Sequence, residues 1–128
     1  MSQIDLNGQR VVIAIFAMGE CPACENYLPR FVAEAEALRE QQGLPFVVYQ
    51  QGQPLTPDAI PILIFDAASP DVDVQAFADR YEVKATPTTL VLHRGAGSFK
   101  TEGSLANNQI QWLLFMAAND TLHRGANR

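Results

Sequence analysis

The residues of this sequence whose types and spacing best suit chemistry are its two cysteines, Cys21 and Cys24. They are spaced C-x-x-C, follow an apolar run that ends at Phe16, and stand at the start of a helical pattern. Two thiols at this spacing can exchange with a disulfide, and a helix N-terminus stabilises the thiolate that carries out the exchange. The sequence therefore predicts a redox dithiol with Cys21 as the nucleophile and Cys24, one helical turn further on, as the resolving thiol.

Two other interpretations of the cysteine pair stay open. In the first, the two thiols carry out no reaction, and the fold serves for binding. A zinc or iron–sulfur site needs further ligands, and the only histidines of the chain are His93 and His123, so a metal site would require two chains. We therefore expect neither a metal nor another cofactor.

Length and charge limit the classes of protein to which the chain can belong. With 128 residues, 48% of them hydrophobic, residues 1–128 are expected to form a single domain with its own core. A net charge of -5 disfavours nucleic acid and anionic membrane surfaces as partners.

The expected location is the cytoplasm. The longest apolar run, Val11–Met18, is far shorter than the roughly 20 residues of a membrane-spanning helix. The residues before it lack the basic region of a signal peptide. In a reducing compartment a C-x-x-C pair is more often a redox or metal site than a structural disulfide.

Apolar patterns along the chain predict alternating strands and helices. Continuous β-branched runs are typical of strands covered on both faces, whereas apolar residues at 3.6-residue spacing predict amphipathic helices. The expected strands are Val11–Phe16, Ile60–Phe65, Thr86–Leu92 and Ser98–Glu102, with a turn at Arg94–Gly97, and the expected helices are Pro22–Gln42, Val72–Tyr81 and Ser104–Ala118. This order indicates an α/β fold with a mixed sheet and helices on both faces. Residues 44–59 are expected to form an insertion, and residues 119–128 a polar tail.

Three features, taken in order, resemble the thioredoxin family over most of the chain. The first is the strand that leads into Cys-Pro-Ala-Cys, with Pro29 eight positions after Cys21. The second is the segment Tyr81–Thr88, which resembles the segment that leads to the family's cis-proline. The third is Gly103, which precedes an amphipathic final helix. The resemblance implies a thioredoxin-like three-layer α/β/α fold with a mixed central sheet, shortened at its N-terminus.

The resemblance also implies an activity and a binding site. The activity is that of a thiol–disulfide oxidoreductase, which exchanges disulfides with protein substrates and is restored by a reductase or by glutathione. Pro87 is expected to form a cis bond with Thr86 and to lie against the dithiol. Thr86, Pro87 and Gly103 are then the expected substrate-binding residues.

The sequence also departs from the family's pattern around the dithiol. Glu20 precedes the first cysteine, and its carboxylate is expected to raise the pKa of the Cys21 thiol, because it opposes a second negative charge. The family's buried acid falls on Ile15 and its buried lysine near Ile62, so neither proton-handling group is present.

A further departure concerns the start of the chain. Only ten residues precede Val11, so the family's usual first strand and helix are missing. One hypothesis is that Phe46–Tyr49 covers the sheet edge that the missing strand would have occupied. These departures favour an alternative function, that of a non-catalytic binding or structural subunit with the thioredoxin fold in a larger protein assembly, for example a viral particle.

Overall fold

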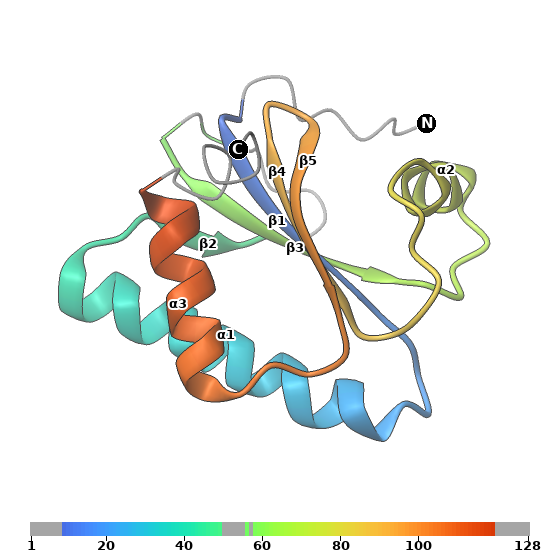
Figure 1. Ribbon diagram of the computed structural model, residues 1–128, viewed down its shortest axis with the longest axis horizontal. Helices are drawn as coiled ribbons and strands as arrows, with labels where there is room; N and C mark the ends of the chain where they lie inside the picture. The colour runs from blue at the N-terminus through green and yellow to red at the C-terminus, as the bar shows by residue number, and fades with distance from the viewer. Residues whose placement is uncertain (1–8, 50–55, 57, 120–128) are drawn as a thin grey trace.

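The computed structural model describes residues 9–49, 56 and 58–119 of the chain (Figure 1). Over these residues the chain forms three helices and a five-stranded sheet in the order β2-β3-β1-β4-β5. The elements are β1 (Val11–Ala17), α1 (Pro22–Gln42), β2 (Phe46–Val48), β3 (Ile60–Asp66), α2 (Val72–Arg80), β4 (Thr88–His93), β5 (Ala96–Glu102) and α3 (Asn107–Ala118). The predicted α/β class with a mixed sheet is confirmed.

Strand β1 is central because its side chains are all apolar and both of its edges are paired. All seven of its residues are buried. β3 pairs with it in parallel and β4 pairs with it antiparallel. A strand without polar side chains is stable only where both of its faces are covered. Because β1 leads directly into the dithiol loop, this rigid strand fixes the position of the two cysteines.

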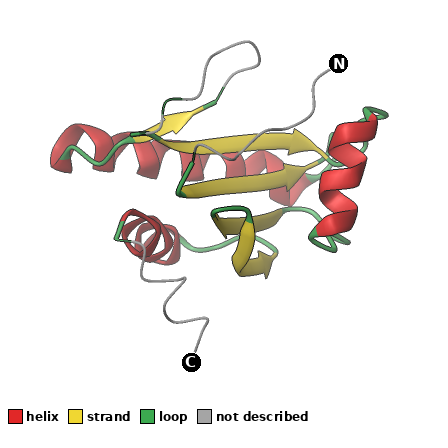
Figure 2. Ribbon diagram, turned by 90° about the horizontal axis from the view of Figure 1, so that it is seen from above, coloured by secondary structure: helices red, strands yellow, loops and turns green. Residues whose placement is uncertain are grey.

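Alternate side chains of β1 enter two cores, one on each face of the sheet. Ile13 and Ile15 pack with the buried faces of α1 and α3. Ala14 and Phe16 point to the opposite face, where the rings of Phe16 and Phe77 of α2 lie 5.9 Å apart. In Figure 1, α2 lies on the other side of the sheet from α1 and α3, and in the view from above α2 runs across the direction of α1 (Figure 2). The molecule therefore has the three α/β/α layers that the sequence predicted.

Helix α1 starts at the dithiol and has the predicted bounds. Pro22 stands in its first turn, where backbone N–H groups have no intrahelical acceptor, so the N–H that proline lacks costs no helix hydrogen bond. At the other end Gly43 adopts a φ of 67° and donates its N–H to the Arg39 carbonyl at 3.1 Å, a cap that a residue without Cβ forms at low cost. Although α1 has 21 residues, no helix in the described part of the chain is long and apolar enough to cross a membrane.

The segment Phe46–Val48 forms an edge strand of the sheet, as hypothesised. It pairs in parallel with β3, with Phe46 opposite Ile60 and Val48 opposite Ile62. Phe46 contributes to the core beneath α1, which anchors this short strand. Residues 50–55 and 57 of the expected insertion and residues 120–128 of the expected tail lie outside the described residues.

The hairpin between β4 and β5 is tighter than predicted. Its turn consists of Arg94 and Gly95, which both have a positive φ, 50° and 84°, as a two-residue turn between twisted strands requires. β5 therefore begins at Ala96, whereas the predicted turn continued to Gly97 and the predicted strand began at Ser98. A bulge in the pairing of β5 with β4 accommodates the additional residue.

Helix α3 begins at Asn107, not at Ser104 as predicted. Gly103 has a φ of 90°, which is incompatible with a right-handed helix. The Leu105 carbonyl accepts a hydrogen bond from the Arg30 guanidinium of α1 at 2.8 Å. The segment before α3 is thus tied to α1 as an extended loop.

Candidate functional site

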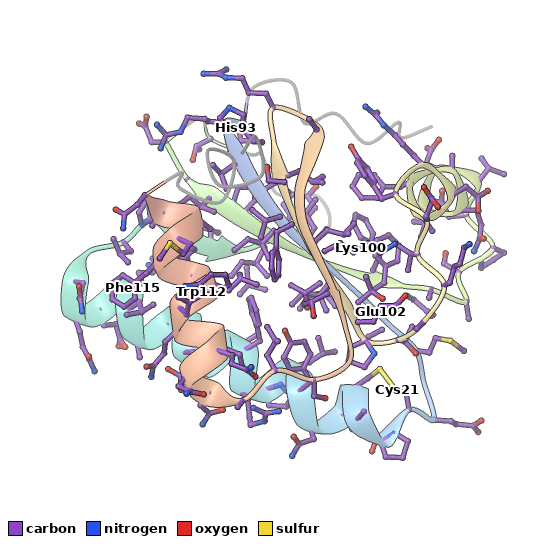
Figure 3. All side chains as sticks on the ribbon, in the orientation of Figure 1. Cys21, His93, Lys100, Glu102, Trp112 and Phe115 are labelled. Carbon is purple, nitrogen blue, oxygen red and sulfur yellow. A yellow bond between two sulfur atoms is a disulfide. The ribbon has the colours of Figure 1, made fainter. Side chains whose placement is uncertain are left out.

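The two cysteines form a disulfide at the N-terminus of α1 (Figure 3). Their Cα atoms are 5.2 Å apart. Cys21 is the N-cap residue of α1, and its Sγ accepts a hydrogen bond from the Cys24 N–H at 3.2 Å. Cys21 is partly exposed, whereas only 1% of the Cys24 surface is exposed. Of the two sulfurs, the one at Cys21 is therefore accessible to a molecule in solution.

The start of α1 supplies the positive potential that a thiolate at Cys21 needs. The first N–H groups of a helix have no intrahelical acceptor, and the aligned peptide dipoles place a partial positive charge there. The Cys24 N–H already points at the Cys21 sulfur. Opening the disulfide would leave this donor in place for the Cys21 thiolate.

Thr86 lies against Cys21 although it is 65 positions later in the chain. Its hydroxyl oxygen is 3.8 Å from the Cys21 Sγ, and its carbonyl oxygen is 4.0 Å from the same atom. The Thr86–Pro87 peptide bond is cis, and Pro87 is buried. β4 begins directly after this bond, at Thr88, so the sheet holds the threonine beside the dithiol.

Gly103 joins the same cluster from the other side of the hairpin. Its N–H donates to the Pro87 carbonyl at 2.8 Å. The next residue, Ser104, donates its hydroxyl to the Ala23 carbonyl in the first turn of α1 at 3.4 Å. The structure thus brings five of the predicted site residues together from the start of α1 and from two loops: Cys21, Cys24, Thr86, Pro87 and Gly103.

Glu20 is exposed and directly precedes the disulfide. Its φ of 57° lies in the left-handed region, which is uncommon for a residue with a side chain and recurs at functional sites. Met18 in the same loop is 43% exposed. The loop therefore presents a carboxylate and an apolar side chain on the surface next to Cys21.

The two positions at which the resembled family has an acid and a lysine are occupied by isoleucines in this chain. Ile15 and Ile62 are both fully buried. Ile15 lies opposite Thr89 in the pairing of β1 with β4. The described residues contain no group of three or more His, Cys, Asp or Glu side chains that could hold a metal ion.

A buried hydroxyl pair near these positions could not be foreseen from the sequence. The Tyr27 hydroxyl of α1 and the Thr89 hydroxyl of β4 form a hydrogen bond of 2.9 Å. Burial raises the pKa of Tyr27, although the bond to Thr89 and the nearby Arg30 guanidinium act in the opposite direction. The only indication in the sequence was a tyrosine at an apolar position of the helix, which needs a hydrogen-bond partner when it is buried. That partner is 62 positions away.

Comparison of the sequence with models of protein families and with curated proteins gives no match. Comparison of the fold with solved structures does give matches, which include three thioredoxins. A mutant thioredoxin from Halobacterium salinarum is 21% identical with a TM-score of 0.57, and the match covers 88% of this chain and 78% of that one. Thioredoxin from Fasciola hepatica is 17% identical with a TM-score of 0.53, covering 84% and 81%. Thioredoxin from Plasmodium falciparum is 14% identical with a TM-score of 0.56, covering 86% and 84%.

These similarities establish that the chain has the thioredoxin fold, as the sequence predicted. The disulfide between Cys21 and Cys24 is consistent with a C-x-x-C site of the thioredoxin type. At these levels of identity the likeness concerns the fold alone.

Proposed function

We propose that this protein exchanges disulfides with protein substrates, with Cys21 as the nucleophile and Cys24 as the resolving thiol. The observation that carries the proposal is the asymmetry of the pair. The Cys21 sulfur is partly exposed and receives the Cys24 N–H at 3.2 Å, whereas Cys24 is 1% exposed. Such a pair offers one sulfur for attack and protects the other for the second step.

In the first step the reduced protein opens the substrate's disulfide. The Cys21 thiolate attacks one sulfur of that bond, a Cys21–substrate disulfide forms, and the second substrate sulfur leaves as a thiolate that takes up a proton. The helix N-terminus favours the thiolate, and the Thr86 hydroxyl, 3.8 Å from the Cys21 sulfur, can donate to it. The substrate backbone would lie against the partly exposed Thr86 and Gly103, with the buried Pro87 beneath them.

In the second step Cys24 releases the substrate. After losing its proton, Cys24 attacks the Cys21 sulfur, the bond between Cys21 and the substrate breaks, and the substrate leaves as its second thiol. Two electrons have then passed from the dithiol to the substrate, and the protein carries the Cys21–Cys24 disulfide. A reductase or glutathione, as in a reducing cytoplasm, supplies two electrons and two protons to restore the dithiol.

Insulin reduction tests the proposal. The wild type, Cys21→Ser and Cys24→Ser are assayed with dithiothreitol, and aggregation of the released insulin B chain is followed. Wild type is expected to accelerate the reduction, and Cys21→Ser to abolish the acceleration because no accessible nucleophile is left. Equal rates for wild type and Cys21→Ser would contradict the proposal and favour a binding or structural subunit.

The Cys24→Ser variant is the matched control for the order of the two steps. It retains the nucleophile but cannot resolve the intermediate. Incubation of the reduced variant with native, disulfide-bonded insulin is therefore expected to accumulate a covalent adduct. Intact mass spectrometry detects this adduct, which dithiothreitol removes. An adduct with Cys21→Ser, in place of Cys24→Ser, would reverse the assigned roles.

A further inference from the structure

Strand β5 presents an open edge of the sheet. It is the last strand in the order β2-β3-β1-β4-β5, and no other strand of the described residues pairs with its outer side. The Gly103 N–H is bonded to the Pro87 carbonyl. Since the bonded groups of an antiparallel pair alternate, Thr101 also turns its N–H and C=O toward β4, whereas Lys100 and Glu102 turn theirs outward. This edge can therefore accept another strand at Lys100 and Glu102.

The side chains of these two outward-facing residues have opposite charges. Lys100 and Glu102 are two positions apart on one strand, so they project from the same face of the sheet, and both are exposed (Figure 3). Charged residues on an edge strand usually discourage pairing with other chains. An alternating pair of charges, however, is complementary to itself when the second strand runs antiparallel.

We propose that two copies of this chain associate through their β5 edges, related by a two-fold axis that passes between the two Thr101 residues. In this register Lys100 of each copy lies directly opposite Glu102 of the other. If the axis passed between the two Lys100 residues, the two lysines would lie opposite each other. If it passed between the two Glu102 residues, the two glutamates would. Like charges directly opposite are destabilising and unlike charges are stabilising, so charge selects the Thr101 register.

The existing contacts of Lys100 are compatible with this pairing. Its ammonium donates to the Glu82 carbonyl at 2.8 Å and to the Tyr81 carbonyl at 3.4 Å. An ammonium group has three donors, so one is left for the carboxylate of Glu102 in the second copy. The two carbonyl contacts hold the lysine in place, which lowers the entropy lost when the second copy binds.

The opposite face of the sheet edge adds an apolar contact. Phe99 of β5 packs edge-on against Trp112 of α3, with ring centroids 5.8 Å apart, and Trp112 is 46% exposed. In the Thr101 register Phe99 faces Gly103 of the second copy. A Cβ placed on Gly103 would have no atom within 4 Å, so this position leaves room for the aromatic pair.

Sedimentation equilibrium of the full chain over a range of concentrations tests the dimer. The measurement contains no substrate, so its outcome does not depend on disulfide exchange. Wild type is expected to dimerise, and Glu102→Lys to weaken the dimer by about tenfold or more because two attractive pairs become repulsive. Lys84→Glu, which reverses an exposed charge outside β5, is the control that is expected to leave the dimer intact. A monomeric wild type, or a dimer that Glu102→Lys does not weaken, would overturn the proposal.

Charge reversal at both positions tests the register. Lys100→Glu alone is expected to weaken the dimer, and Lys100→Glu combined with Glu102→Lys to restore it. Mixing the two single variants is expected to give a heterodimer, because each glutamate of one chain then lies opposite a lysine of the other. Lys100→Glu also removes the contacts to Tyr81 and Glu82, so its folding is checked by circular dichroism, while Glu102→Lys leaves those contacts in place. Failure of both the double variant and the mixture to dimerise would overturn the register.

Discussion

The phenolic oxygen of Tyr27 lies 2.9 Å from the hydroxyl oxygen of Thr89, and this hydrogen bond joins α1 to β4 inside the core. Both residues are fully buried. Thr89 lies opposite Ile15 on β1, the position at which the resembled family has a buried acid. In this chain the interior next to that position therefore contains two neutral hydroxyl groups that satisfy each other.

Removing both hydroxyls of this pair is expected to destabilise the protein by less than the sum of the two single removals. Tyr27→Phe leaves the Thr89 hydroxyl without its partner, and Thr89→Val does the same to Tyr27, so each is expected to cost about 1–3 kcal/mol. The double variant leaves neither group unpaired, so its cost should fall below the sum of the two single costs. Urea unfolding of the four proteins measures this. Additive costs would contradict the pairing.

The same tyrosine is expected to make the protein sensitive to alkaline pH. Burial, the largest cause, raises the pKa of Tyr27 above its usual value of 10.0. In the unfolded chain the tyrosine ionises near that usual value, whereas the folded protein keeps it neutral to a higher pH. The stabilisation is therefore complete below about pH 10 and is lost as the pH rises toward the folded-state pKa. Unfolding free energies from pH 8 to 11 should fall less steeply for Tyr27→Phe than for wild type, and parallel curves would contradict this.

Much of the fold follows from local sequence, because the decisive signals are short in range. Val11–Phe16 contains no polar residue and is rich in β-branched side chains, which favours a strand covered on both faces. The bounds of α1 follow from Pro22 at one end and Gly43 at the other, two residues with restricted or special backbone preferences. The start of α3 was predicted wrongly because Leu105 matches the apolar period of the helix, although its carbonyl bonds to Arg30. Periodicity does not reveal a tertiary hydrogen bond.

The site was predictable only in part, because it is assembled from distant segments. Spacing alone places Cys21 and Cys24 on one helical turn. The approach of Thr86 to Cys21 spans 65 positions, and its prediction depended on a family resemblance. Tyr27 and Thr89 are 62 positions apart, and no family resemblance pointed to the contact between them. Long-range polar contacts of this kind leave no periodic signal in a single sequence.

Glu20 is expected to hold back the ionisation of Cys21. It is exposed and directly precedes the nucleophile, and a neighbouring carboxylate opposes formation of a thiolate. In the reduced protein Glu20→Gln should therefore move the midpoint of Cys21 alkylation by iodoacetamide to lower pH. Glu36→Gln, an exposed change further along α1, is the control and should leave the midpoint unchanged. An identical profile for Glu20→Gln and wild type would mean that solvent screens the charge.

A proline placed in β2 is expected to be costly at Val47 and mild at Val48. The Ile60 N–H donates to the Pro45 carbonyl, and the Tyr49 N–H donates to the Ile62 carbonyl. In a parallel pair this alternation turns the Val47 N–H toward β3 and the Val48 N–H away from it. Val47→Pro therefore removes a sheet hydrogen bond and leaves the β3 carbonyl unpaired, a loss of about 1–3 kcal/mol. Thermal and urea unfolding of the two variants compare the costs directly. Equal destabilisation would mean that β2 does not stabilise the sheet through this pairing, and that its contribution comes from the burial of Phe46.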